Sequence, residues 1–303
     1  MSATGTTAPQ EPSPALDRSR PFGAHLRMSW WTPLVLLTVP ALVMVVLQVL
    51  LYGLVAVVEG SDDPLATSLT PLKLLAVNVS IAVSGLLAVV LLTWTTGAPW
   101  RSLISWPRAF DVRRLVHHLL GAALMVAAGI GVVALVAPGS PGWTAFGISG
   151  TTVALLVVTV LTTPAQAAGE ELMFRSVALP AAASWVRAVR PALVVGLVVS
   201  GLAFAAVHGS VDPWLAGYYT LIGVSTGLMA VLSGGIEAPV AFHVANNVLA
   251  TVVNSVMADG GAVPLDRSVG AGDASLLVLV AVNVAMVVLV WAHERRRPGP
   301  ARS

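Results

Sequence analysis

The stretch VALLVVTVLTTPAQAAGEELMFRSVALPAAA, residues 153–183, decides how this chain must fold. Its first half is almost wholly apolar, and so is the run that follows Arg175. Between the two halves stand Glu170, Glu171 and Arg175. A charged side chain at the centre of a membrane helix costs about 2.5–3.5 kcal/mol on insertion scales. If this run crosses a membrane, the three charges need a reason to be there.

The composition of the whole chain indicates such a crossing. Of 303 residues, 56% are hydrophobic and 10% are charged, whereas a soluble globular domain has about 25% charged residues. A membrane-spanning helix needs about 20 apolar residues, and the runs here do not alternate as barrel strands do. We therefore predict an all-α fold, a polytopic membrane helix bundle of about eight transmembrane helices. The expected spans are roughly 30–58, 74–96, 115–137, 151–180, 192–210, 214–232, 237–257 and 274–292.

The two ends of the chain are more polar than the rest. Residues 1–28 are rich in Ser, Thr, Pro and Ala, which predicts a disordered cytoplasmic tail. Residues 29–293 form the expected membrane domain, and residues 294–303 a basic cytoplasmic tail. The chain has no cysteine, so neither disulfides nor thiol catalysis is possible.

Basic residues are unevenly divided between the expected connections. Thirteen arginines lie in the two tails and in the second-to-third and fourth-to-fifth connections, whereas the opposite connections hold only Lys73 and Arg267. An excess of Lys and Arg marks cytoplasmic loops. We therefore predict a multi-pass protein of the plasma membrane with both termini in the cytoplasm. Its environment is the lipid bilayer, and the basic residues do not indicate a nucleic-acid partner.

Part of the charge cluster has a structural explanation. Arg175 follows Glu171 by four residues, which places both on one helix face as an ion pair. Such a pair can fix how the helix packs on its neighbours, but it leaves Glu170 unexplained. An ionisable residue inside a membrane is by default a hypothesis of a functional site.

Two further polar motifs lie on later helices. His208 ends FAAVH, with Phe204 four residues earlier, and His243 begins HVANN, with Asn247 four residues later. Taken alone, each histidine is typical of a packed, hydrogen-bonded group between helices. Together with the glutamates, these residues supply carboxylates, imidazoles and an amide on three helices.

This set of groups has two chemical uses. A carboxylate beside an imidazole can hold and deprotonate a water molecule, while a second imidazole and an amide N–H can stabilise an oxyanion. Alternatively, Glu170, His208 and His243 can bind a divalent metal such as zinc, with water in the open position. The residues alone leave both uses open.

Taken in chain order, the motifs E-E-x-x-x-R, F-x-x-x-H and H-x-x-x-N resemble those of the CAAX protease and bacteriocin-processing (Abi) family of intramembrane proteases, which includes the type II CAAX prenyl endopeptidases. The resemblance covers a catalytic core of about residues 150–257. It implies an eight-helix fold with a polar cavity facing the cytoplasm. It also implies hydrolysis of a peptide or protein substrate near the cytoplasmic leaflet by an activated water.

The resemblance further implies a role for each motif residue. Glu170 activates the water with help from His208. His243 and Asn247 stabilise the tetrahedral oxyanion. Glu171 belongs to the catalytic set, in which it supports the site and pairs with Arg175. Arg175 and Phe204 are supporting residues. The motif does not decide which glutamate is the base, and it fits both a metal-dependent and a metal-free glutamate mechanism.

The expected helix positions raise a difficulty for this mechanism. Glu170 and His243 lie toward the cytoplasmic ends of their helices, whereas His208 lies near the opposite end of its own. The rise along a helix then predicts a difference in depth of about 15–20 Å. A bend at Pro164 would reduce this difference. The mechanism requires His208 within about 10 Å of a glutamate.

Two other functions fit the same scaffold. One is a non-enzymatic membrane protein, such as an immunity factor or a partner-binding subunit, whose phenotype would survive Glu170→Gln. The other is a transporter with a proton relay through the buried ionisable groups. A transporter predicts two related halves with broken helices, and the sequence contains no such repeat.

Overall fold

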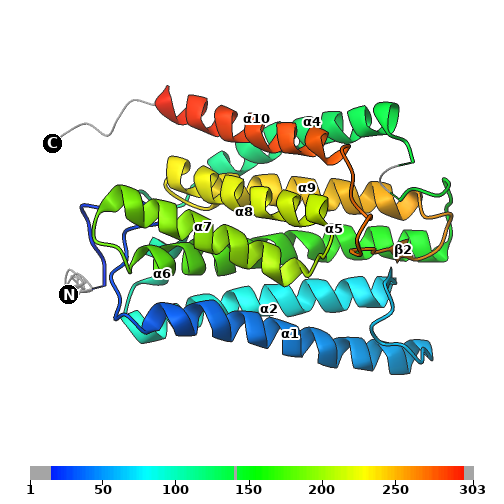
Figure 1. Cartoon of the computed structure of the whole chain (residues 1–303), viewed down its shortest axis with the longest axis horizontal. Coiled ribbons are helices and arrows are strands. Elements are labelled where there is room, and N and C mark those ends of the chain that lie inside the picture. The colour runs from blue at the N-terminus through cyan, green and yellow to red at the C-terminus, as the bar shows by residue number, and fades with distance from the viewer. Residues whose placement is uncertain (1–14, 140–141, 297–303) are drawn as a thin grey trace, which may run out of the picture.

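A computed structural model describes residues 15–139 and 142–296 of the chain. In this part, eight long helical stretches lie side by side at the positions expected from the apolar runs (Figure 1). They are α1 (Thr32–Glu59), α2 (Pro71–Thr96), α4 (Val112–Val136), α5 (Gly150–Glu171) with its continuation η1 (Leu172–Ala178) and α6 (Leu179–Ala183), α7 (Val189–His208), α8 (Pro213–Ser233), α9 (Glu237–Val256) and α10 (Leu276–Arg295). The connections contain a short helix, α3 (Trp100–Ile104), and an antiparallel pair of two-residue strands, β1 (Ser68–Leu69) and β2 (Val263–Pro264). The prediction of an all-α bundle is confirmed.

Seven of the described helical stretches are long and apolar enough to cross a membrane. The eighth, α9, is as long as several of these, but its polar residues lower its mean hydropathy. It packs against α4, α5 and α8, so that its polar face meets protein (Figure 1). The structure thus agrees with a polytopic membrane bundle whose most polar helix is central.

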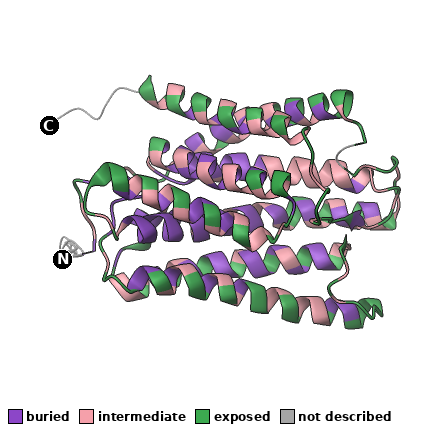
Figure 2. Ribbon diagram, viewed as in Figure 1, coloured by how far each residue is buried: buried purple, intermediate pink, exposed green. Residues whose placement is uncertain are grey.

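Burial follows the pattern of a membrane protein. Buried residues concentrate on the inner helices, while exposed residues follow the outer faces of α1 and α10 (Figure 2). Many exposed residues are large and apolar; Leu124 and Leu135, for example, are 75% and 85% exposed. Glu171 and Arg175, in contrast, are fully buried. A continuous exposed apolar surface of this kind needs lipid to cover it, so the chain is a multi-pass membrane protein.

Close contact between α2 and α5 positions the glutamates. A Cβ atom added at Gly85 of α2 would lie 2.2 Å from the carbonyl oxygen of Gly169, the residue before Glu170. A Cβ atom added at Gly169 would lie 2.7 Å from the Cα atom of Ala82. Small residues allow membrane helices to approach this closely. The backbone contact therefore fixes the position of the charge cluster along α2.

The amino-terminal segment, residues 15–28, corrects the prediction of a disordered tail. Leu16 and Leu26 pair as an antiparallel bridge, and Phe22, His25 and Leu26 are fully buried. The physical reason is that PFGAHL, within the polar tail, supplies apolar side chains that cover one end of the bundle. The rest of the tail lies outside the described residues.

The carboxyl-terminal prediction is tested only in part. Glu294 and Arg295 continue α10 as helix, whereas residues 297–303 lie outside the described part of the chain.

The two ends of the bundle differ in charge. The start of α1 and the end of α10 lie at the same end of the bundle (Figure 1). We call this the arginine-rich end; it also contains residues 15–28 and the connections 97–111, 184–188 and 234–236. The opposite, arginine-poor end contains residues 60–70, 137–139, 142–149, 209–212 and 257–275.

Candidate active site

Glu170 and Glu171 lie where regular α-helix changes to π-helix. They are the last two residues of α5, and η1 begins directly after them. Within η1, the carbonyl of Phe174 accepts a hydrogen bond from the Ser200 hydroxyl of α7 at 2.9 Å. Single π-helical turns inside α-helices occur frequently at functional sites. Here the turn places two adjacent carboxylates in the interior of the bundle.

Glu171 and Arg175 form the ion pair that their spacing predicts. The Arg175 Nε lies 3.1 Å from Oε2 of Glu171, and both side chains are fully buried. The same Nε donates to the Thr226 hydroxyl of α8 at 2.8 Å. The guanidinium also lies 4.9 Å from the centre of the Phe204 ring, where a cation is attracted to the ring face. Arg175 therefore ties α5, α7 and α8 together around Glu171.

His243 lies between the two glutamates. Its Nδ1 is 2.7 Å from Oε1 of Glu171, and its Nε2 is 3.0 Å from Oε2 of Glu170. An imidazole donates from both nitrogens only when it carries two protons. In that state the charges of His243 and Arg175 balance the two carboxylates. Glu170, which the spacing alone left unexplained, thus has a partner on α9.

His208 is held in one orientation at the end of α7. Its Nδ1 lies 2.7 Å from the carbonyl oxygen of Phe204. Because a carbonyl only accepts, Nδ1 carries the proton, and Nε2 of the neutral ring is left as an acceptor. Tyr219 stacks on the imidazole at a ring distance of 4.1 Å. The Phe204 ring lies 4.5 Å from His208 and 5.8 Å from His243, so it stands beside both imidazoles.

One cavity of about 420 Å³ brings the predicted residues together. Glu170, His208, His243 and Asn247 all line it. The separation in depth expected for His208 is absent because the α7–α8 turn lies short of the far ends of α1 and α2 (Figure 1). The helix that carries Glu170 also continues to Ala183, which places this carboxylate further from the helix end than expected.

Asn247 belongs to a chain of amides along the cavity wall. Its Nδ2 donates to Oε1 of Gln166 at 3.1 Å, and its Oδ1 accepts from Asn246 at 3.1 Å. Sequence reasoning missed Gln166, although it precedes Glu170 by four residues and shares its helix face. It also missed Tyr219, for which no local pattern gives a signal.

The cavity occupies the half of the bundle nearer the arginine-poor end. It begins at Glu170 and His243 and continues along the helices toward Tyr52, Asn78, Ile130, Tyr219, Asn254 and Leu265. Within the described part of the chain, no residue of the connections at the arginine-rich end lines it. A cytoplasm-facing cavity and cytoplasmic termini were both predicted from the sequence. This geometry contradicts the combination, because the cavity extends toward the end of the bundle opposite the start of α1 and the end of α10.

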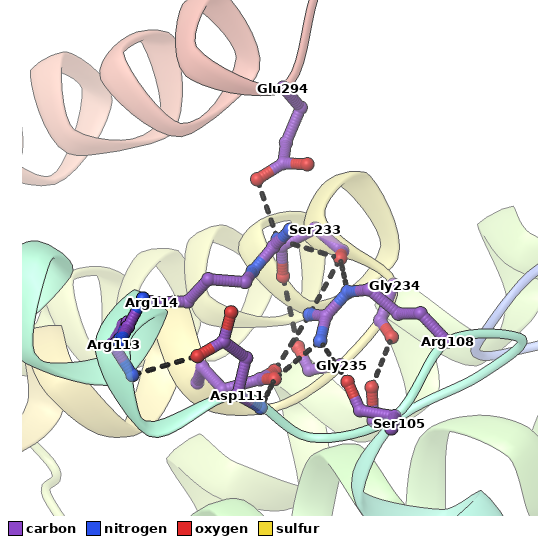
Figure 3. A network of polar contacts seen from close by, with 11 residues as sticks. Ser105, Arg108, Asp111, Arg113, Arg114, Ser233, Gly234, Gly235 and Glu294 are labelled. Carbon is purple, nitrogen blue, oxygen red and sulfur yellow. Dashed lines mark hydrogen bonds and ion pairs between the residues drawn. The ribbon is translucent and has the colours of Figure 1, made fainter. Parts of the chain in front are cut away.

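The arginine-rich end is closed by ion pairs (Figure 3). Arg108 pairs with Glu237, with Nη2 donating to Oε2 at 2.8 Å, and also donates to the carbonyl of Ser233. Arg114 donates to the same carbonyl and to Glu294, at 3.0 and 2.6 Å. These contacts fasten the connection before α4 and the end of α10 to the α8–α9 turn.

The predicted metal ligands do not fit a three-ligand metal site. Across residues 15–139 and 142–296, no group of three His, Cys, Asp or Glu side chains is arranged so that it could hold a metal ion. Both ring nitrogens of His243 face carboxylates instead. Glu170, His208 and His243 share the cavity, but their arrangement favours direct contact between protein groups and water.

Comparison with known proteins agrees with the motifs. Residues 149–249 match the family described as Type II CAAX prenyl endopeptidase Rce1-like. This range contains all three motifs and ends two residues after Asn247. No curated protein and no solved structure matches the chain. The resemblance to the CAAX protease family inferred from the sequence is therefore confirmed: residues 149–249 are similar to the Rce1-like type II CAAX prenyl endopeptidases.

Proposed function

We propose that this protein is an intramembrane endopeptidase that hydrolyses a peptide or protein substrate with a water activated by Glu170 and His208. The observation that carries the proposal is the cavity in which Glu170, His208, His243 and Asn247 meet. These residues come from α5, α7 and α9, so only the folded bundle assembles them.

The reaction uses protein groups and water. A water molecule lies between Glu170 and Nε2 of His208, and Glu170 takes its proton as the oxygen attacks the peptide carbonyl. The oxyanion of the tetrahedral intermediate accepts a hydrogen bond from the Asn247 amide. It also accepts one from Nε2 of His243, which turns from Glu170 to the oxyanion once Glu170 has taken the proton and is neutral. The proton then passes from Glu170 to the leaving amine as the C–N bond breaks. Glu171 holds His243 in place through Nδ1.

We also propose that the substrate enters from the extracytoplasmic side of the plasma membrane. The excess of arginine favours a cytoplasmic position for the arginine-rich end. The cavity lies toward the other end of the bundle. This proposal keeps the predicted orientation of the chain and replaces the predicted cleavage near the cytoplasmic leaflet.

Activity is tested by Glu170→Gln, with Glu59→Gln as the control. Glu59 ends α1 at the exposed, arginine-poor end and does not line the cavity. Purified variants in proteoliposomes are incubated with a peptide library, and the products are identified by mass spectrometry. We expect Glu170→Gln to lose about 100-fold or more of the cleavage rate, and Glu59→Gln to match the native protein. A wild-type protein that cleaves nothing would favour the non-enzymatic alternative.

The side of entry is tested by labelling, because the native chain has no cysteine. Val269, at the arginine-poor end, is 76% exposed, and Trp100, at the arginine-rich end, is 54% exposed. We expect a membrane-impermeant maleimide to label Val269→Cys in intact cells, and Trp100→Cys only after lysis. The reverse pattern would place the cavity toward the cytoplasm.

A further inference from the structure

The connection between α9 and α10, residues 257–275, carries an arginine into the cavity wall. Its β2 strand pairs with β1, and the Leu265 N–H donates to the Thr67 carbonyl at 2.7 Å. Two residues later, the Arg267 carbonyl accepts from the Val211 N–H at 3.1 Å. The connection is thus attached to both the α1–α2 and the α7–α8 turns, so the position of Arg267 is fixed by the fold.

The guanidinium of Arg267 lies beside the proposed catalytic groups. Its Nη1 donates to the carbonyl of His208, and the residue lines the same cavity as Glu170. Of the described residues that line this cavity, Arg267 is the one lysine or arginine. It is therefore the cation that a ligand entering from the arginine-poor end meets.

Arg267 has no carboxylate partner among the described residues. Its Nε atom is buried and makes no hydrogen bond there. In contrast, the buried guanidinium groups of Arg114 and Arg175 each contact a glutamate. Arg267 itself is half-buried. A partly desolvated charge without a counter-charge is unfavourable, so a partner supplied from outside would stabilise it.

Asp266 precedes Arg267 in the chain, and Asp212 follows Val211, which contacts the Arg267 backbone; both carboxylates accept hydrogen bonds from other residues. Asp266 accepts hydrogen bonds from the backbone and hydroxyl of Ser268, at 2.9 and 2.7 Å. Asp212 accepts from the backbone N–H groups of Leu215 and Gly270, both at 2.9 Å. Both carboxylates thus stabilise turns. The Arg267 guanidinium contacts the His208 carbonyl and Tyr219, both uncharged, so no carboxylate balances its charge in the cavity wall.

We propose that Arg267 is a substrate-recognition residue that binds a carboxylate of the peptide. The carboxylate is either the free carboxyl terminus or an Asp or Glu side chain. It lies on the side of the scissile bond nearer the arginine-poor end of the bundle. A guanidinium binds a carboxylate through two parallel hydrogen bonds. Binding at Arg267 also keeps the substrate carboxylate away from Glu170, whose negative charge would repel that carboxylate. This inference rests on the proposed peptidase function for the identity of the ligand.

The test measures binding in the Glu170→Gln background, where cleavage does not interfere. The probes are a fluorescein-labelled apolar heptapeptide with a free carboxyl terminus, the same peptide as an amide, and that amide with one glutamate introduced. Fluorescence anisotropy in detergent gives each Kd. Two variants are made in the Glu170→Gln background. Arg267→Gln retains an N–H donor for the His208 carbonyl, and Arg267→Lys retains the positive charge. The control is Lys73→Gln, which removes a buried cation from the same end of the bundle but not from the cavity.

We expect the acid peptide to bind about 10-fold or more tightly than the amide, and Arg267→Gln to remove this difference. Arg267→Lys should keep part of it, and Lys73→Gln should leave it unchanged. Tight binding of the glutamate-containing amide identifies a side chain, rather than the terminus, as the ligand. Equal binding or no binding of the acid and the amide overturns the proposal. If the carboxylate preference depends on Arg267 while the native protein cleaves no peptide, recognition stands and the proposed peptidase function fails.

Discussion

Arg175→Met should destabilise the protein more than any other single change at the charge cluster. The guanidinium is fully buried, 3.1 Å from the Glu171 carboxylate. At that distance and an effective dielectric constant of about 20, the attraction is about 5 kcal/mol. Methionine fills much of the volume but leaves His243 as the one positive charge in contact with both Glu170 and Glu171, so one buried negative charge is no longer balanced. Removing one partner of a buried pair typically costs about 3–5 kcal/mol, and we expect a loss in that range.

The assay is a double-mutant cycle with Glu171→Gln. Glutamine keeps an acceptor oxygen for Nδ1 of His243 but removes the charge that Arg175 balances. We therefore expect the double variant to be more stable than Arg175→Met alone by about 2 kcal/mol. Unfolding in mixed micelles, followed by tryptophan fluorescence, measures the free energy of unfolding of all four proteins. Thr226→Val, which removes a neutral partner of Arg175, should cost less, about 1.5–3 kcal/mol.

Two outcomes would refute this reasoning about the cluster. One is an Arg175→Met variant within about 1 kcal/mol of the native protein, which would mean that Glu171 does not depend on its partner. The other is a double variant whose loss equals the sum of the two single losses. Additivity would show that the residues, although in contact, do not interact energetically.

Three further predictions concern the helix contact, the oxyanion and the amino-terminal segment. Gly85→Ala should cost about 1–3 kcal/mol of unfolding free energy, because the added methyl group overpacks against Gly169. The control Gly121→Ala, where a Cβ meets nothing within 4 Å, should be neutral or slightly stabilising. Thermal unfolding compares the two variants. Asn247→Ala should lower kcat by about 100- to 1000-fold with little change in KM, because it removes an oxyanion donor; steady-state cleavage measures both, and an effect on KM alone would contradict the role. Burial lowers the pKa of His25 to about 4 from an ordinary value of 6.5, so the unfolded chain binds more protons between these values and stability should fall as the pH drops from about 6.5 to 4. His25→Phe should flatten the dependence of stability on pH in this window, and an unchanged slope would count against the assignment.

The helices could be predicted because hydrophobic length is a local property of the sequence. The spans expected at 214–232 and 237–257 are observed as Pro213–Ser233 and Glu237–Val256. The Glu171–Arg175 pair could be predicted for the same reason, since four-residue spacing places both side chains on one helix face.

The partners of the glutamates could not be predicted in the same way. The contact between Glu171 and His243 joins residues 72 positions apart on different helices, and the spacing within each motif does not indicate how α5 and α9 pack. The resemblance indicated that these motifs act together, but it assigned His243 to the oxyanion and did not place it between two carboxylates. The direct contact appears only in the folded bundle.

Local sequence patterns also could not predict toward which end of the bundle the cavity extends. It depends on the α7–α8 turn, which brings His208 to the interior, and on the connection to α10, which brings Arg267 beside it. Loop positions of this kind follow from tertiary contacts and not from hydropathy. The burial of residues 15–28 was missed for a related reason, because their polar composition resembles that of a flexible tail although Phe22 and His25 pack against the bundle.

The most direct test of the central claim is peptide hydrolysis by purified protein in water enriched in ¹⁸O. If Glu170 activates a water in this cavity, the native protein will release peptides whose new carboxyl termini carry ¹⁸O, as read by mass spectrometry. The Glu170→Gln variant, folded to the same extent by thermal unfolding, will release none above background. Equal labelled cleavage by both proteins would contradict the account.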